Sequence, residues 1–310
     1  MTEPTSQPDP RSVSVVVATR DRPELLRRAL DAIEAQDVDH DLEVIVVFDR
    51  SEPDRSLEFE RPGRRLVVTT NARTPGLPGA RNSGIDKAGN QWIAFCDDDD
   101  EWFPGKLSAQ FAAIDRSPGA KAACTGIFIR YEGEDTPRIP DPARLTFEGF
   151  LSDRMTEVHP SSWLIQREWL TTEVGLVDEE IPGGYAEDYD LMLRAARLGP
   201  IAVAPEPLVR VWWHGASFFF ERWKMIDEAL DYLLAKYPEF ADDAAGWARI
   251  EGQRAVAQAA MGQRRRALAT IGGIVRRRPL EKRVPVAVAV ALGVPPGTVL
   301  AAAHRFGRGI

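Results

Sequence analysis

The 310-residue sequence predicts an α/β protein with a mostly parallel central sheet, helices on its faces and a helical C-terminal tail. Two observations predict this fold class. Short, β-rich apolar runs alternate with helical patterns early in the chain, which is typical of a parallel-type sheet that helices cover on both faces. From Ala241 onward the composition is instead helical and strongly basic, so we expect a separate tail.

The early part of the chain contains four predicted strands, each followed by a helical pattern or a loop. After the first strand, Asp21, Pro23 and Glu24 have the composition of a helix start, and apolar residues then recur at helical spacing. A Gly- and Pro-containing loop at 76–84 runs into another helix, and Pro104 begins the next one. The predicted strands span residues 13–19, 42–48, 65–71 and 92–96.

The middle of the chain has a more mixed pattern. Residues 131–147 are rich in Pro, Gly and acids, which predicts a loop. Residues 187–198 form a predicted helix, because apolar residues recur at helical spacing after an acidic start that the helix dipole favours. Extended segments are expected at 122–131, 159–165 and 201–213, and an amphipathic helix at 218–237.

Charge and cysteine content restrict the class of protein. Residues 241–310 carry 12 basic and 4 acidic residues, a net charge of +8, whereas the rest carries 27 basic and 43 acidic residues, a net charge of −16. An acidic body argues against nucleic-acid binding. Cys96 and Cys124 lie in apolar runs, so neither a disulfide framework nor a zinc site is predicted, which fits a reducing compartment.

The two ends of the chain were considered as targeting or membrane segments. Residues 1–12 are polar and contain proline, so we expect a disordered N-terminus rather than a signal peptide. Residues 284–303 form an uncharged run as long as a membrane span, but Pro285, Pro295 and Pro296 interrupt it. We therefore expect the tail to pack on the body or to contact an anionic membrane surface through its basic clusters.

Four consecutive aspartates, residues 97–100, directly follow the predicted strand 92–96. Adjacent carboxylates repel one another, and a hard divalent cation such as Mg²⁺ or Mn²⁺ compensates their charge because it prefers oxygen ligands. The carboxyl end of a strand is also where ligands bind in open α/β sheets. The alternative is an acidic turn or helix start with no ligand, but a buried strand is a poor place for unused charge.

Six motifs occur in the order that an inverting family 2 glycosyltransferase shows. They are VSVVVATRDRPELLRRAL, EVIVVFDRS, GLPGARNSGI, WIAFCDDDDEW, GGYAEDYDLMLRAARLG and VRVWWHG. Each alone is a weak signal, but together they make residues 13–215 resemble that family. The resemblance implies the GT-A fold of nucleotide-diphospho-sugar transferases. Phe48 departs from the pattern, because the family usually has an aspartate there and a second one at the place of Asp49.

The resemblance also implies roles for individual residues. Asp99 is the expected metal ligand, with His214 as a second ligand, and Asp188 is the expected general base, with Glu187 as its alternative. The residues expected to bind the nucleotide are Thr19, Arg20, Asp49, Arg81, Asp97 and Asp98. The residues expected near the acceptor are His159, Trp163 and Tyr185.

The resemblance divides the chain into functional parts. Residues 13–120 are expected to bind the nucleotide sugar, 121–240 to bind the acceptor and carry the catalytic base, and 241–310 to form the basic tail. It implies a metal cofactor, Mn²⁺ or Mg²⁺, a UDP-, GDP- or dTDP-linked donor, and a hydroxyl acceptor on a glycan or lipid-linked molecule. It further implies a cytoplasmic location, at the inner face of the membrane if the tail binds there. The expected process is the assembly of a cell-surface polysaccharide or glycolipid.

Three other classes of protein share some of these features. A nucleotidyltransferase also joins acids to a nucleotide-binding sheet, but an early Gly-rich loop followed by Lys is missing and Asp188 would have no task. A prenyl synthase would use Asp97, Asp98 and Glu101 as a diphosphate motif, but that motif belongs on a helix of an all-α protein. A non-catalytic homologue would bind the sugar nucleotide without turnover.

Overall fold

The computed structural model describes residues 9–213 and 222–299. They form two compact units. The first holds most of the chain up to residue 213, and the second holds 148–154, 180–186 and the chain from residue 222. The tail expected from residue 241 is thus part of a helical unit that begins earlier. Trp92 Nε1 donates to the Pro10 carbonyl at 3.0 Å, so the disorder expected for residues 1–12 does not extend to Pro10.

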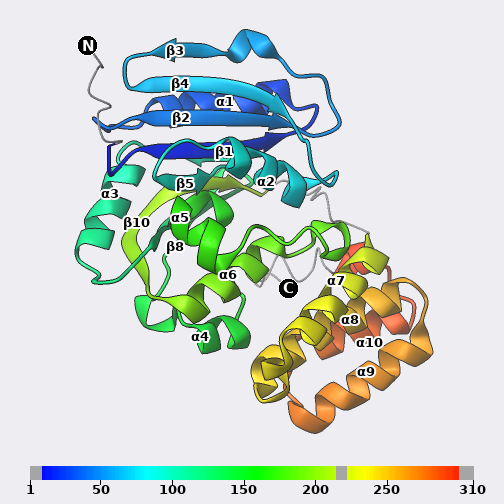
Figure 1. The fold of residues 1–310 in the computed structure, drawn as a ribbon. Coiled ribbons are helices and arrows are strands. Elements are labelled where there is room, and N and C mark those ends of the chain that lie inside the picture. Colours follow the sequence, from blue (N-terminus) through cyan, green and yellow to red (C-terminus); the bar gives the residue numbers. More distant parts are fainter. Residues whose placement is uncertain (1–8, 214–221, 300–310) are drawn as a thin grey trace, which may run out of the picture. The chain divides into compact units, whose positions relative to one another are not determined.

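The first unit is built on a ten-stranded sheet with the order β3-β4-β2-β1-β5-β9-β7-β10-β6, and β8 pairs with β7 (Figure 1). Strands β4, β2, β1 and β5 are parallel neighbours, as are β7 and β10, whereas β9 is antiparallel to both β5 and β7. The sheet as a whole is therefore mixed, with the expected parallel core. Its strands are β1 Val13–Thr19, β2 Leu42–Phe48, β3 Phe59–Arg61, β4 Arg64–Thr70, β5 Trp92–Phe95, β6 Glu101–Trp102, β7 Ala122–Tyr131, β8 Glu134–Arg138, β9 Trp163–Gln166 and β10 Ile201–Trp212.

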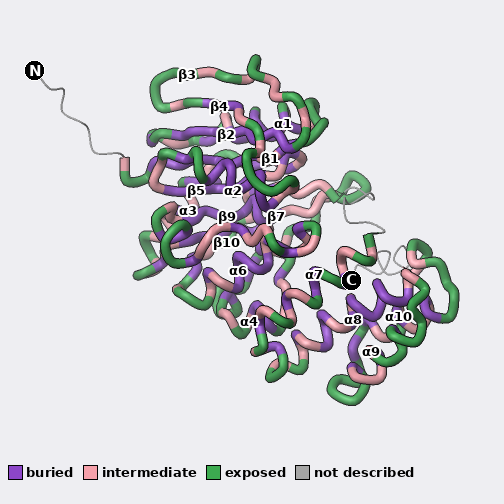
Figure 2. The backbone as a smooth tube through the Cα atoms, turned by 45° about the vertical axis from the view of Figure 1, so that its right-hand side comes forward, coloured by how far each residue is buried: buried purple, intermediate pink, exposed green. Residues whose placement is uncertain are grey.

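Helices cover both faces of the parallel core. On one face, α1 (Pro23–Glu34) and α3 (Lys106–Asp115) bury apolar side chains against β1, β2 and β5. On the other face, α2 (Leu77–Lys87) approaches so closely that a Cβ atom at Gly84 would lie 2.3 Å from Val16 Cγ1. Figure 2 shows the strands largely buried between these layers. A sheet of this size excludes the all-helical prenyl synthase. The remaining helices of this unit are α5 Arg167–Trp169 and α6 Glu187–Leu198.

The second unit is helical. Its helices are α7 Trp223–Lys236, α8 Ala244–Ala260, α9 Arg264–Arg277 and α10 Arg283–Ala291, and α4 Phe147–Ser152 contributes all but its first residue. Small and branched side chains of α8, α9 and α10 form its core, among them Ala248, Ala255, Ile271, Ile274 and Ala287. The apolar α10 therefore packs within the protein. Across residues 9–213 and 222–299, no helix combines the length and hydropathy needed to cross a membrane.

Candidate active site

The four aspartates lie in a turn immediately after β5, at the edge of the sheet where β1 also ends. Thr19 Oγ1, at the end of β1, donates to Asp98 Oδ2 at 2.7 Å. Arg22 Nη1 lies 3.2 Å from Asp98 Oδ1 and 3.1 Å from Asp99 Oδ2. Burial and the neighbouring carboxylates raise the pKa of Asp98 to about 6, although Thr19 and Arg22 oppose the shift. The turn is thus tied to the start of α1 through polar contacts.

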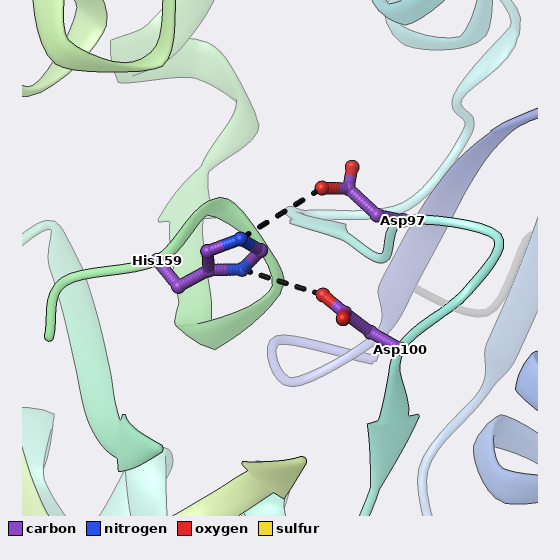
Figure 3. Close-up of side chains that lie close together, drawn as sticks. All are labelled: Asp97, Asp100 and His159. Atoms are coloured by element: carbon purple, nitrogen blue, oxygen red, sulfur yellow. Dashed lines mark ion pairs between the residues drawn. The ribbon is translucent and has the colours of Figure 1, made fainter. Parts of the chain in front are cut away.

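A second group combines Asp97, Asp100 and His159, whose ligand atoms all lie within 4.8 Å of one another (Figure 3). His159 Nδ1 lies 3.3 Å from Asp100 Oδ2, and His159 Nε2 lies 4.0 Å from Asp97 Oδ2. Burial raises the pKa of Asp100 well above its ordinary value and lowers that of His159, which favours a neutral imidazole. Two crowded carboxylates and a neutral imidazole are suitable ligands for a divalent cation.

Ser161 fixes this group from the short 3₁₀ segment Pro160–Ser162. The Asp97 backbone N–H donates to Ser161 Oγ at 3.0 Å, and Ser161 Oγ donates to Asp100 Oδ2. One fully buried hydroxyl therefore holds both aspartates of the group in position. Neither Ser161 nor Asp100 was assigned an individual role from the sequence. The signal available there was the His-Pro-Ser-Ser string that begins the extended segment expected at 159–165.

Arg81 of α2 connects the acidic turn to α6. Its Nη2 lies 2.7 Å from Asp97 Oδ1, and its Nη1 forms an ion pair with the Glu187 carboxylate. Burial would lower the pKa of Arg81, but Glu187, Asp97 and Asp188 raise it above its ordinary value, so the guanidinium is charged. Burial raises the pKa of Glu187 against the pull of Arg81. The Asp188 backbone N–H donates to Glu187 Oε2 at 2.6 Å, which orients the first turn of α6.

A small pocket lies between this ion pair and β9. Asp188 is half-buried and lines the pocket, whereas Glu187 is buried and forms an ion pair with Arg81. Trp163 also lines it but is only 2 % exposed. The other lining residues are Arg81, Phe95, Pro160, Val177, Leu191 and Met192. Asp188 is thus the more accessible of the two carboxylates that the family resemblance selected.

A more open pocket of about 180 Å³ lies beside the ends of β1 and β2. Thr19, Arg22 and Phe48 line it together with Ser51, Glu52, Asp54, Leu57 and four residues of the β1–α1 connection and α1. The Phe48 ring therefore supplies an apolar wall where the family usually has a carboxylate. The size and the mixed apolar and polar lining suit a planar, polar-edged group.

Asp49 does not line this open pocket. Its Oδ1 accepts from Asn71 Nδ2 at 2.8 Å and from the Gly76 N–H at 3.1 Å, and its Oδ2 accepts from Arg50 Nε at 3.1 Å. Burial opposes ionisation of Asp49, but these donors lower its pKa below the ordinary value. The carboxylate thus joins the ends of β2 and β4 to the start of α2.

The three remaining predicted residues are Arg20, Tyr185 and His214. Arg20 is exposed, and its Nε lies 3.8 Å from Asp21 Oδ2. Tyr185 belongs to the second unit. His214 lies outside the described residues. The predicted residues thus form two groups. One group, at the start of α1, contains Thr19, Asp98 and Asp99. The other group, around Arg81 and the small pocket, contains Arg81, Asp97, His159, Trp163, Glu187 and Asp188.

A buried polar network supports the loop that carries His159. Lys106 Nζ, which is fully buried, donates to Gln110 Oε1 at 3.0 Å and lies 3.8 Å from the centroid of the Trp102 ring. Gln110 Nε2 donates to the Ser162 carbonyl at 2.8 Å, and Ser162 Oγ donates to the His159 carbonyl at 2.7 Å. The ammonium end of Lys106 thus lies in the interior behind the site.

Replacing Lys106 by methionine should stabilise the protein. Burial lowers the pKa of Lys106 to about 7, so the unfolded chain binds a proton that the folded chain lacks between that pH and about 10.4. The free energy of unfolding therefore rises with pH across this window. Below the window, the folded chain bears the full cost of burying the charged Lys106 side chain. We expect Lys106→Met to raise the free energy of unfolding at neutral pH by about 2–4 kcal/mol and to remove this pH dependence.

Urea denaturation near neutral pH and at about pH 9.5 measures both effects. The difference in the free energy of unfolding between Lys106→Met and wild type should be smaller at the higher pH. Lys121→Met is the control, because that side chain is 44 % exposed and forms its ion pair with Glu173 at the surface. A gap that is the same at both pH values would contradict the assignment of a buried neutral amine.

A mixed α/β sheet with an acidic turn after β5 agrees with the GT-A fold that the sequence predicts. The family model described as Glycosyl transferase family 2 matches residues 14–172, about half of the chain. The chain therefore belongs to glycosyl transferase family 2 and is a glycosyltransferase. This membership favours sugar transfer over the nucleotidyl transfer considered above.

Curated relatives of this chain are named as glycosyltransferases. The "Uncharacterized glycosyltransferase YwdF" of Bacillus subtilis is 26 % identical over 187 residues, which are 60 % of this chain and 68 % of the relative. The "GalNAc(5)-diNAcBac-PP-undecaprenol beta-1,3-glucosyltransferase" of Campylobacter jejuni is 36 % identical over 101 residues. That match covers 31 % of this chain and 32 % of the relative, so this chain corresponds to about a third of that protein's length.

Solved structures share the fold. TarS of S. aureus in complex with UDP-GlcNAc gives a TM-score of 0.61 at 18 % identity, over 96 % of this chain and 92 % of that one. Mannosyltransferase PcManGT from Pyrobaculum calidifontis, in complex with GDP-Man and Mn²⁺, gives a TM-score of 0.52 at 18 % identity. The match covers 97 % of this chain and 82 % of that one. At this identity the similarity establishes the fold, in agreement with the GT-A expectation.

Proposed function

We propose that this chain is a metal-dependent, inverting glycosyltransferase that moves a sugar from a nucleotide-diphosphate sugar to an acceptor hydroxyl. One observation carries the proposal. The buried Arg81 guanidinium contacts Asp97 of the acidic turn and Glu187, the neighbour of Asp188, so it links the acidic end of the sheet to the carboxylate expected to act as base. Inverting transfer needs both parts of such a site, a place for the leaving diphosphate and a base for the attacking hydroxyl.

Asp97, Asp100 and His159 would hold the divalent cation, Mn²⁺ or Mg²⁺. Their donor atoms lie close together, and the crowded carboxylates need a counter-charge. When bound, the cation would neutralise negative charge on the leaving diphosphate. Asp99 with His214 is the alternative ligand set, which the family resemblance implied. The Mn²⁺ named with PcManGT supports a metal of this type.

The open pocket beside β1 and β2 is the proposed site of the nucleoside. Thr19 lines this pocket and its hydroxyl donates to Asp98, so a hydroxyl and a carboxylate lie next to the proposed nucleoside site for a ribose. The Phe48 ring offers an apolar face to a base. Asp49 would shape this pocket through its loop contacts. The UDP-GlcNAc and GDP-Man named with the structural neighbours support a nucleotide-sugar donor.

Asp188 is the proposed general base. A carboxylate beside the sugar accepts the proton as the acceptor oxygen attacks the anomeric carbon on the face opposite the diphosphate, which inverts that carbon. Glu187 is less suited to this role because Arg81 already occupies it in a buried ion pair. Arg81 in turn keeps α6, and with it Asp188, next to the acidic turn. Trp163 and His159 border the same region, consistent with acceptor contacts.

The proposed acceptor is a glycan or lipid-linked hydroxyl in the assembly of a cell-surface polysaccharide or glycolipid. The name of the Campylobacter jejuni relative includes undecaprenol, a lipid carrier of this kind. We place the reaction in the cytoplasm, at the inner face of the membrane where such an acceptor lies. The basic second unit fits that location through its charge.

Calorimetric titration of UDP, GDP and dTDP, with and without Mn²⁺, tests the donor site. We expect one nucleotide to bind, to require the metal, and to bind at least about tenfold more weakly to Asp97→Ala, because loss of a ligand weakens metal binding. Asp99→Ala distinguishes the two ligand sets. Asp115→Ala is the control, since that side chain is 57 % exposed on α3. If every nucleotide fails to bind with metal present, the donor site is wrongly assigned.

A further inference from the structure

Helix α9 of the second unit presents one face to the core and the other to solvent. Ala267, Ile271 and Ile274 are buried at helical spacing and form the inner face. The outer face has the same spacing and consists of Arg265, Leu268, Gly272, Val275 and Arg276. Figure 1 draws α9 at the edge of this unit. The outer face combines apolar and cationic side chains along about 20 Å of helix.

Most of the cations around this face have no ion pair within the described residues. Arg266 and Arg283 do form ion pairs, with Asp227 at 3.0 Å and with Glu281 at 2.8 Å. Within residues 222–299, six other basic residues at the two ends of α9 have no ion pair: Arg264, Arg265, Arg276, Arg277, Arg278 and Lys282. All six are exposed. Between residues 261 and 299, Glu281 is the only acid in the sequence, so this surface has an uncompensated positive charge.

Large apolar side chains lie among these cations. Leu280, in the turn after α9, is 92 % exposed, and Leu292, after α10, is 80 % exposed. Leu268 and Val275 on α9 are 55 % and 43 % exposed. A Cβ atom at Gly293 would lie 3.8 Å from Arg264 Nη2, so the turn that carries Leu292 lies beside the start of α9. Exposed leucines at both ends of one basic helix need a partner that accepts apolar and cationic groups together.

We propose that this surface, defined as the basic apolar face and made of Arg264, Arg265, Leu268, Val275, Arg276, Leu280 and Leu292, rests on an anionic lipid bilayer. Leucine side chains enter the boundary between headgroups and acyl chains, while the arginines remain at the headgroup phosphates. Each cation near an anionic membrane adds attraction, and the apolar groups add burial. A nucleic acid would use the arginines but leave Leu280 and Leu292 in water. The inference rests on the proposed function, since a lipid-linked acceptor would lie in that bilayer.

Flotation of the full chain with vesicles tests the proposal. One set of vesicles contains phosphatidylglycerol and phosphatidylcholine in equal parts, and the other contains phosphatidylcholine alone. We expect binding to the anionic vesicles only, weakened at least about tenfold in Arg265→Gln/Arg276→Gln, because each cation contributes about fivefold. Leu280→Ser/Leu292→Ser should also weaken it. The control is Lys87→Gln/Arg116→Gln, which removes two exposed charges from the first unit and should change nothing.

Two outcomes would overturn the proposal. One is equal recovery on both kinds of vesicle or on neither. The other is equal loss of binding in the test and control variants, which would indicate a non-specific charge effect. Nucleotide titration of the same preparations distinguishes a failure of membrane binding from a failure of the proposed donor site. Vesicle binding without nucleotide binding would refute the proposed function alone, and the converse would refute the membrane surface alone.

Discussion

Asp188→Asn should lower kcat for sugar transfer by about 10³-fold, within the range that a positioned general base contributes. The amide has nearly the same shape as the carboxylate but cannot accept the proton of the acceptor hydroxyl. Nucleotide binding should be unchanged, because Asp188 lines the smaller pocket beside Trp163 and not the open pocket beside Phe48. Initial rates with saturating donor, together with calorimetry of the nucleotide, measure the two quantities separately.

Glu187→Gln is the informative comparison for this variant. Loss of the Glu187 charge disturbs the buried pair with Arg81, so we expect a loss of stability in addition to any loss of activity. Asp86→Asn is the matched control on α2, because Asp86 is 51 % exposed and pairs only with Arg73. Asp188→Asn with more than a tenth of wild-type kcat would argue that another group takes the proton.

The parallel core could be predicted from the sequence because three of its strands, β1, β2 and β5, are buried on both faces. Residues 13–19 and 42–48 were expected as strands and match β1 and β2 at both ends. The short strands β3, β6 and β8 were not predicted. Strand β8 contains Pro137 and the exposed Glu134, and it was predicted to be part of a loop. Its strand geometry depends on pairing with β7, which local sequence does not encode.

The composition of the site was predictable to a lesser degree than the fold. The sequence placed the four aspartates at the end of a buried strand, where they are. It could not indicate which of them share a cluster, because the side-chain directions in a turn follow from local backbone geometry. His159 comes from a loop about 60 positions further along, and only the pairing of β9 with β5 brings that loop to Asp97. The assignment of Asp99 as metal ligand therefore stays a prediction.

The structure gives Asp49 loop contacts that its motif does not imply, and its role at the nucleotide stays a prediction. The motif places it at the nucleotide base. In the structure, both carboxylate oxygens accept hydrogen bonds from Asn71, Gly76 and Arg50, which lie in three different segments. An oxygen at a strand end can satisfy loop donors or a ligand, and the sequence motif does not distinguish these uses. Phe48, which breaks the motif, is the residue that lines the open pocket.

Arg81→Met should be the most destabilising change in the site, by about 3–5 kcal/mol, because it leaves two carboxylates without their cation. The Glu187 side chain is 4 % exposed, so water cannot replace the guanidinium there. Arg81→Lys should recover only part of the loss, since one ammonium cannot hold Asp97 and Glu187 as the forked guanidinium does. Chemical denaturation of the three proteins measures these differences, and the exposed Arg116→Met serves as control.

The pH dependence of Arg81→Met tests the same ion pair independently. Without Arg81, the strongest influence that lowers the pKa of Glu187 is gone, while burial, Asp188 and Asp97 still raise it, so its pKa in the folded variant lies still further above that of the unfolded chain. A carboxyl group with a raised folded pKa stabilises the fold when protonated, and this contribution is lost as pH rises through the folded pKa. The variant should therefore approach wild-type stability at about pH 5 and fall behind it at about pH 8. Arg81→Met/Glu187→Leu removes one of the two unpaired charges and should recover part of the loss at the higher pH. If the double variant is as unstable as Arg81→Met, the cost does not come from the buried carboxylate.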